Sequence, residues 1–241
     1  MNLKSVEKLS DKLDEESSWR RLELTNLKFN IESSEGNKLN TNLRASLVLL
    51  YSHWEGFVKQ ALAFYLQHVS QQKLHNNVLK YNFYALEMRK DINEISNSKK
   101  ASLHTNLIEK IFNDINIISN IPFENQINTK SNLNSGLFKE LMNTVGLDSD
   151  QYKNFFHLID ERLLGVRNSI AHGEAMQKTQ LTKDSYLDLH EKMIEIIDML
   201  KDQIVIAAIQ RSYMISDVEN LKKISSFIIE PESKSDIGTY V

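Results

Sequence analysis

An apolar repeat in residues 39–73 constrains the fold more than any other feature of this chain. Apolar residues recur there in steps of three and four, which is the spacing of one face of an α-helix. The repeat consists of Leu39, Leu43, Leu47, Leu50, Trp54, Phe57, Val58, Ala61 and Tyr65. Residues 3–32 and 183–213 follow similar spacings, and Thr182 is a suitable N-cap for the last segment. Because such helices must bury their apolar faces against each other, we expect an all-α helical bundle.

The scarcity of helix-breaking residues agrees with this fold class. Only 7 glycines and 2 prolines occur among 241 residues, so long stretches can stay helical. The length suits one large domain, and we expect a single domain over residues 1–241. Residues 75–147 are rich in asparagine and have short apolar pieces, which predicts an insertion of two or three short helices and an extended piece at 115–123. Residues 216–241 are interpreted as a C-terminal tail.

Charge, cysteine content and hydropathy exclude several classes of protein. The net charge is −3, whereas proteins that coat nucleic acids by electrostatics carry a basic excess, so any RNA-binding role must depend on a local site. The absence of cysteine excludes disulfides, a thiolate nucleophile and cysteine-based metal sites. Residues 1–19 are too polar for a signal peptide, and apolar runs such as 204–209 are too short to cross a bilayer. We expect a soluble, cytoplasmic protein without membrane contacts.

Residues 148–173 carry the most chemistry in the chain. Capping residues begin the segment, an apolar stripe continues it, and Gly173 provides a plausible helix end. Its last turns contain Arg167, Asn168 and His172. A purely structural interpretation exists, because arginine and histidine near a helix C-terminus interact favourably with the helix dipole. Asn168 and His172, four positions apart, would then simply share one polar face of the helix.

The same three residue types are sufficient to cut RNA without a metal ion. Histidine has the unperturbed pKa closest to neutrality, so it can accept and return protons near pH 7. Arginine offers a charged, planar group that matches two phosphate oxygens, and asparagine can orient a phosphate or an imidazole. One group would deprotonate the 2′-hydroxyl while another stabilises charge on the phosphate during in-line attack.

The spacing within this segment predicts a dimer. Arg167 and His172 are five positions apart, which places them about 140° apart around a regular helix and roughly 7.5 Å apart along it. They therefore do not share a face. A long arginine can still curl toward the histidine, but a second copy related by a twofold axis would complete the site more easily.

Two segments together resemble the HEPN superfamily, the higher eukaryotes and prokaryotes nucleotide-binding domains. The sequence RNSIAHG at 167–173 resembles the R-x4-6-H motif of that superfamily. The sequence LRASLVLLYSHWEGFVKQAL at 43–62 resembles the second helix of a bacterial branch found in defence and toxin contexts. The resemblance covers these two helices and their surroundings, and it does not extend to residues 75–147.

The resemblance implies a HEPN-like helical bundle that forms a homodimer with two motifs facing each other across a cleft. Many such proteins are metal-independent endoribonucleases that leave a 2′,3′-cyclic phosphate and a 5′-hydroxyl. His172 would be the general base or acid, Arg167 would bind the scissile phosphate, and Asn168 would orient substrate or histidine. Glu55 would hold the arginine. We expect no cofactor and no metal ion, an RNA substrate, and by analogy an antitoxin or another defence-system partner protein.

Other interpretations stay open from the sequence alone. Many members of the superfamily are inactive, so the chain could be a non-catalytic module that dimerises, binds a nucleotide or RNA, or assembles a defence complex. His53 could lie near the same cleft, and Tyr51 is assigned to packing. His157 and Glu161 are four positions apart, but without a third ligand they favour a surface ion pair over a metal site.

Overall fold

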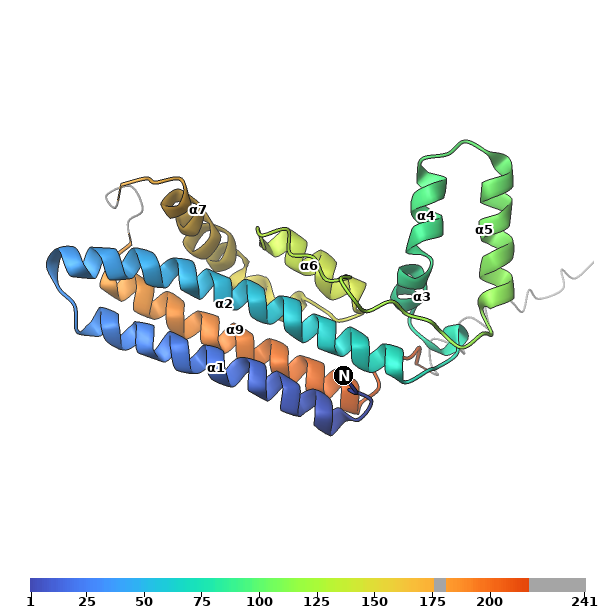
Figure 1. Ribbon diagram of the computed structural model, residues 1–241, viewed down its shortest axis with the longest axis horizontal. Coiled ribbons are helices and arrows are strands. Elements are labelled where there is room, and N and C mark those ends of the chain that lie inside the picture. Colours follow the sequence, from blue (N-terminus) through green and yellow to red (C-terminus); the bar gives the residue numbers. More distant parts are fainter. Residues whose placement is uncertain (176–180, 217–241) are drawn as a thin grey trace, which may run out of the picture.

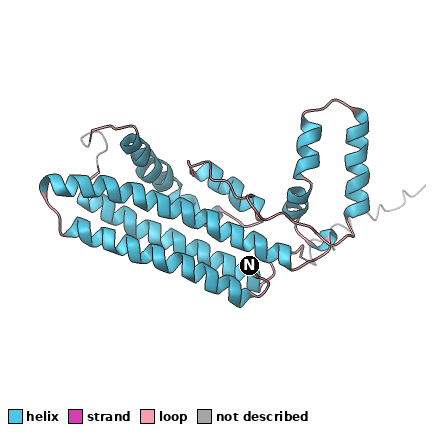
Figure 2. Cartoon of the chain, in the orientation of Figure 1, coloured by secondary structure: helices cyan, strands magenta, loops and turns pink. Residues whose placement is uncertain are grey.

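The computed structural model describes residues 1–175 and 181–216, and the regular secondary structure within these ranges is entirely helical (Figure 2). Three long helices, α1 (Val6–Glu32), α2 (Gly36–Gln71) and α9 (Lys183–Ile209), pack side by side as a bundle (Figure 1). The predicted all-α fold is confirmed. The ends of the three helices differ from the predicted ones by a few residues, as is usual for frayed helix termini.

Local sequence explains where the bundle helices begin and which face they bury. The Ser5 hydroxyl accepts from the backbone of Lys8 at the start of α1. Thr182 and Ser185 form a reciprocal capping box at the start of α9, which confirms the predicted cap. The apolar repeat of α2 is buried apart from the partly exposed Leu39, and Trp54 and Phe57 are fully inaccessible to solvent.

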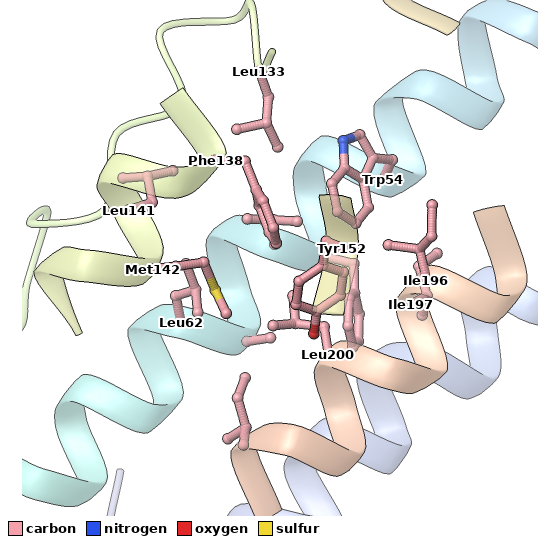
Figure 3. Packing of buried hydrophobic residues seen from close by; sticks show 14 of the residues in the cluster. Trp54, Leu62, Leu133, Phe138, Leu141, Met142, Tyr152, Ile196, Ile197 and Leu200 are labelled. Atoms are coloured by element: carbon pink, nitrogen blue, oxygen red, sulfur yellow. The ribbon is translucent and has the colours of Figure 1, made fainter. Parts of the chain in front are cut away.

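The hydrophobic core also joins the bundle to residues from the 75–147 region. Trp54 of α2 packs against Phe138, with ring centroids 5.4 Å apart, and Phe138 contacts Tyr152 at 5.1 Å. Figure 3 shows these rings together with Leu200 of α9. The helix that carries Phe138, α6 (Ser135–Thr144), is therefore fixed to the bundle by apolar packing.

The rest of the 75–147 region consists of short helices and one extended segment. A 3₁₀ turn (Asn76–Val78) leads to α3 (Tyr81–Glu87), α4 (Arg89–Ser96) and α5 (Ala101–Asp114). Helices α4 and α5 form a hairpin that projects from the bundle and has no buried residue (Figure 1). The short helices were predicted, and the extended piece is longer than the predicted 115–123.

The extended segment, residues 115–134, is called the strap below because it is tied to α2 at two points. The Ser70 hydroxyl donates to the carbonyl of Ile121 at 2.8 Å. The backbone N–H of Leu133 donates to the Tyr51 hydroxyl at 2.7 Å. Since Ser70 lies near the C-terminal end of α2 and Tyr51 lies near its middle, the strap runs antiparallel to this helix.

Residues 148–173 do not form the regular helix that their apolar pattern predicts. A 3₁₀ helix (Asp150–Phe155) is followed by a π-helix (Leu158–Gly165) and by the short α-helix α7 (Val166–Ala171). A Cβ atom at Gly165 would lie 3.3 Å from the carbonyl oxygen of Asp160, so a glycine fits this winding well. The predicted end at Gly173 is confirmed, since its φ of +78° is a conformation that glycine adopts without strain.

Two expectations concern the extremities of the chain and its hydropathy. The predicted tail at 216–241 lies, apart from Ser216, outside the described residues. Among the residues that are described, none of the helices is long and apolar enough to cross a membrane.

Candidate functional site

The side chain of Arg167 is held in one orientation between α2, α7 and the strap. Its guanidinium carbon lies 4.4 Å from the centroid of the Tyr51 ring, which is a cation–π distance. Its Nη1 donates to Asn168 Oδ1 at 2.8 Å, and its Nη2 donates to the carbonyl oxygen of Ser131 at 3.3 Å. The side chain remains partly exposed, so its other N–H groups are available to an anionic ligand.

Tyr51 is the platform under the arginine. Its ring is buried, and its hydroxyl accepts from the backbone of Leu133 at 2.7 Å. Burial, with a smaller contribution from the neighbouring Glu55 carboxylate, raises the pKa of Tyr51 to about 12. The phenol therefore stays neutral near pH 7.

Glu55 lies beside Tyr51 and not beside the arginine. Its carboxylate is close enough to the Tyr51 hydroxyl to raise the pKa of that group, and it makes no direct hydrogen bond or ion pair with Arg167 or His172 in the part of the chain described. The direct hold on the arginine that the sequence suggested for Glu55 is therefore not seen.

Asn168 joins α7 to the strap. Besides accepting from Arg167, its side chain donates to Asn132 Oδ1 across 3.4 Å, a long hydrogen bond. Its backbone carbonyl accepts from the N–H of His172 at 2.9 Å, within the last turn of α7. Asn168 thereby connects the arginine, the strap and the turn that carries the histidine.

His172 is the C-cap residue of α7 and its side chain is exposed. Within the described residues, the imidazole makes no hydrogen bond. The backbone just beyond it is fixed, because Arg44 of α2 donates to the carbonyl oxygen of Glu174 at 2.7 Å. The last turn thus has a defined position against α2.

Arg167 and His172 lie at opposite ends of α7 and do not contact each other. Arg167 bends back over α2 and the strap, whereas His172 extends from the last turn. This agrees with the different faces that their spacing predicts. One chain presents both groups without bringing them together.

Other sequence candidates lie away from this site. The His53 ring is buried between α2 and α1, 5.3 Å from the Trp19 ring, with Nε2 3.2 Å from the Glu23 carboxylate. Burial lowers the pKa of His53, so it is a neutral core histidine. His157 and Glu161 are exposed, and no group of three His, Asp or Glu residues that could hold a metal ion occurs in residues 1–175 and 181–216.

Sequence analysis did not identify three contributors to the site: Arg44, the Tyr51 ring and the strap. A signal for the first two existed, because Arg44, Tyr51 and Glu55 are spaced by seven and four positions and therefore share one face of α2. Ser131 and Asn132 of the strap gave no such signal. Their place depends on the long-range bond between Leu133 and Tyr51, which no local pattern encodes.

Comparison with known proteins gives one match. The model of the family described as RiboL-PSP-HEPN matches residues 15–205 of the chain. Among curated proteins and among solved structures, no match was found. The matched range includes all of α2, about two thirds of α1, most of α9, the strap and the whole arginine–histidine segment.

Proposed function

Because the chain belongs to the RiboL-PSP-HEPN family, we propose that it is a metal-independent endoribonuclease. Its active site contains Arg167, Asn168 and His172, with Glu55 as a positioning residue. Membership of the family favours a function in RNA cleavage or RNA binding. The presence of a complete arginine–asparagine–histidine set favours cleavage, because a scaffold has no chemical need for it.

The observation that carries the proposal is the fixed orientation of the Arg167 side chain. Its guanidinium is stacked on Tyr51 and fixed by Asn168 and by the Ser131 carbonyl, although it is partly exposed. A surface arginine with no ligand to bind would normally be free to rotate, because fixing such a side chain costs conformational entropy. Phosphate chemistry requires a preorganised charged donor and an acid–base group, and Arg167 and the exposed His172 of the same segment can supply them.

The reaction follows from the properties of these groups. A histidine acting as general base removes the proton of the 2′-hydroxyl, and the 2′-oxygen attacks the adjacent phosphorus. Arg167 stabilises the additional negative charge on the non-bridging oxygens. The bond from phosphorus to the 5′-oxygen breaks, and that oxygen receives a proton from a general acid. The products are a 2′,3′-cyclic phosphate and a 5′-hydroxyl, with atoms and charge balanced and no redox step.

A homodimer would bring the two groups of the motif together. Within one chain, Arg167 and His172 extend from opposite ends of α7. Two copies related by a twofold axis would place the arginine of each motif near the histidine of the other, so that each of two sites would contain one arginine and one histidine.

The biological setting we propose is toxin–antitoxin or antiphage defence in the cytoplasm, by resemblance to the bacterial branch. An active toxin slows the growth of its host when expressed alone. We expect growth arrest on induction of the wild type, and normal growth for His172→Ala produced at the same level. Equal growth of the cells that produce the wild type and those that produce His172→Ala would contradict the proposed role as a toxin.

The nuclease proposal is tested with purified protein and a mixed RNA in the presence of EDTA. The wild type should cut and leave 2′,3′-cyclic phosphate ends, while His172→Ala and Arg167→Ala should each lose about 100-fold or more of the rate. His157→Ala is the matched control, because His157 is an exposed histidine on the same helical segment. This control should cut like the wild type. Binding of RNA without cleavage by any of the proteins would instead support a non-catalytic module.

A further inference from the structure

A tight turn in the strap lies directly against the proposed active site. The backbone N–H of Asn132 donates to the carbonyl oxygen of Thr129 at 3.1 Å, which closes a four-residue turn. Within this turn, the carbonyl oxygen of Ser131 accepts from the guanidinium of Arg167 at 3.3 Å. Residues 129–132 are called the strap turn below. The strap turn therefore touches the group that is proposed to bind the scissile phosphate.

The backbone of the strap turn is strained. Both of its central residues, Lys130 and Ser131, have a φ of +53°. Two successive positive φ angles are characteristic of a type I′ turn, in which glycine, asparagine and aspartate are strongly preferred. Other residues lose stability in this conformation, because their Cβ lies too close to a carbonyl oxygen. Lysine and serine thus occupy positions at which they cost stability, and such strained residues concentrate at functional sites.

The hydrogen bonds of the motif fix the orientation of the Asn132 side chain. A guanidinium can only donate, so Asn168 must present its amide oxygen to Arg167 and its amide N–H to Asn132. Asn132 must in turn present its own oxygen to Asn168. The side-chain N–H groups of Asn132 are left without an acceptor among the described residues, and this side chain is exposed. They are therefore available to a ligand bound at Arg167.

Lys130 supplies an exposed cation on the same turn. Its ammonium group forms no hydrogen bond or ion pair within the part of the chain described. A free cation and free amide donors beside an arginine match the oxygens of a phosphate backbone. A demand for these side chains explains why the strained positions do not hold glycine or asparagine.

We propose that the strap turn is part of the substrate-binding surface. Asn132 donates to a non-bridging oxygen of the scissile phosphate beside Arg167, and Lys130 neutralises a neighbouring phosphate. Asn132 thereby stabilises the charge that develops during attack, whereas Lys130 contributes to affinity. This inference rests on the proposed function, because it adds two substrate-binding residues to that site.

The first experiment compares two variants of the same shape within the strap. Asn132→Asp keeps the oxygen that accepts from Asn168 and removes the N–H donor, so kcat for RNA cleavage should fall about 100-fold at an unchanged Tm. Asn132→Ala, which adds no charge, should also lose kcat. Asn128→Asp is the matched control, because Asn128 is exposed and its Oδ1 accepts from the backbone of Lys130, as a carboxylate would. This control should cut like the wild type.

The second experiment separates strain from binding with two exposed lysines of positive φ, Lys130 and Lys73. Lys130→Asn and Lys73→Asn, each added to full-length His172→Ala, should both raise Tm by about 1–3 °C, because asparagine tolerates this conformation better. The probe is a fluorescent mixed-sequence octaribonucleotide in EDTA. Only Lys130→Asn should reduce the salt dependence of binding, by about 0.7 in the logarithmic slope for one phosphate. Lys73 follows the end of α2, outside the site, and is the matched control.

Either of two results overturns the proposal: Asn132→Asp cuts like Asn128→Asp, or Lys130→Asn binds RNA with the same salt dependence as Lys73→Asn. Failure of the proposed function gives a different result. A wild type that does not cut removes the nuclease, and the binding experiment, which needs no cleavage, then decides whether the strap turn contacts RNA. Absence of any RNA binding overturns both.

Discussion

The position of a single side chain, Arg167, depends on a residue that sequence analysis assigned to packing. Tyr51 is buried as expected of a packing residue, and its ring also supports the guanidinium while its hydroxyl receives the backbone of the strap. The residues of the motif could be selected from residue types and spacing alone. The contact of Tyr51 with the arginine could not be predicted in this way. A buried tyrosine on an apolar helix face looks like any other core residue until the position of the neighbouring segment is known.

Two substitutions of Tyr51 distinguish the contact of its ring with Arg167 from the hydrogen bond of its hydroxyl with the strap. Tyr51→Phe keeps the ring under Arg167 but leaves the buried N–H of Leu133 without an acceptor, which should lower the free energy of unfolding by about 1–3 kcal/mol. Tyr51→Leu also removes the cation–π contact and should reduce kcat/KM for RNA cleavage further than Tyr51→Phe. Urea denaturation and cleavage rates measure both effects. Equal activity of the two variants would show that the ring does not position the arginine.

The long helices and the irregular segments differ in how far sequence predicts them. Helices α1, α2 and α9 follow from apolar spacing, and side-chain caps also mark the starts of α1 and α9, because both signals are local. The π-helix depends on contacts that are distant in the chain. Asp160 accepts from both the backbone N–H and the hydroxyl of Ser135, each at 2.6 Å, and so ties the π-helix to the start of α6. No local sequence pattern in residues 158–165 predicts this bond.

Removal of that tie should loosen α6. Asp160→Ala leaves the first N–H of α6 without its charged acceptor, and we expect the free energy of unfolding to fall by about 1–3 kcal/mol. Hydrogen exchange of the α6 amides should accelerate more than that of α2. Asp198→Ala is the matched control, because Asp198 forms an exposed ion pair with Arg21 that should contribute less than about 1 kcal/mol. If both variants lose the same stability, the Asp160 bond has no special role.

In the whole molecule, the bundle is a base on which distant segments assemble the candidate site. Three segments that are distant in the sequence contact each other there: residues 44–55 of α2, residues 131–133 of the strap and residues 167–174. The 75–147 region, which matched no known pattern in the sequence, thus contributes one wall of the site through the strap. Whether a second copy completes the site is a separate question, which subunit mixing answers.

Co-purified heterodimers of Arg167→Ala with His172→Ala should recover activity if each active site combines the arginine of one copy with the histidine of the other. One of the two sites in such a heterodimer has both groups intact, so about half of the wild-type rate is expected. Each homodimer should be inactive under the same conditions. A heterodimer as inactive as the homodimers would mean that both groups come from one chain.

Three buried histidines should make the stability of the fold sensitive to acid. His53, His68 and His190 are 5%, 1% and 6% exposed, and burial lowers the pKa of each in the folded chain. Below about pH 6.5 the unfolded chain protonates these residues while the folded chain keeps them neutral, so unfolding takes up protons. The free energy of unfolding should therefore fall as the pH decreases from 7.5 to 5.5. The expected limit is about 1.4 kcal/mol per pH unit for each histidine.

Urea denaturation across this pH range measures the effect. His68→Gln removes one titrating group, so its stability should depend less steeply on pH than that of the wild type. A stability that stays constant or rises on acidification would contradict the assignment of these histidines as neutral in the fold.

Attack by the 2′-hydroxyl is measured most directly with a chemically modified substrate. After the preferred cleavage position in a short oligoribonucleotide is mapped in EDTA, the nucleotide on its 5′ side is replaced by its 2′-deoxy form. Cleavage at that bond should disappear, while binding of the oligonucleotide remains, because the nucleophile is gone and the contacts of Arg167 to the phosphate are kept. Continued cleavage at the same bond would contradict 2′-hydroxyl attack and with it the proposed roles of His172 and Arg167.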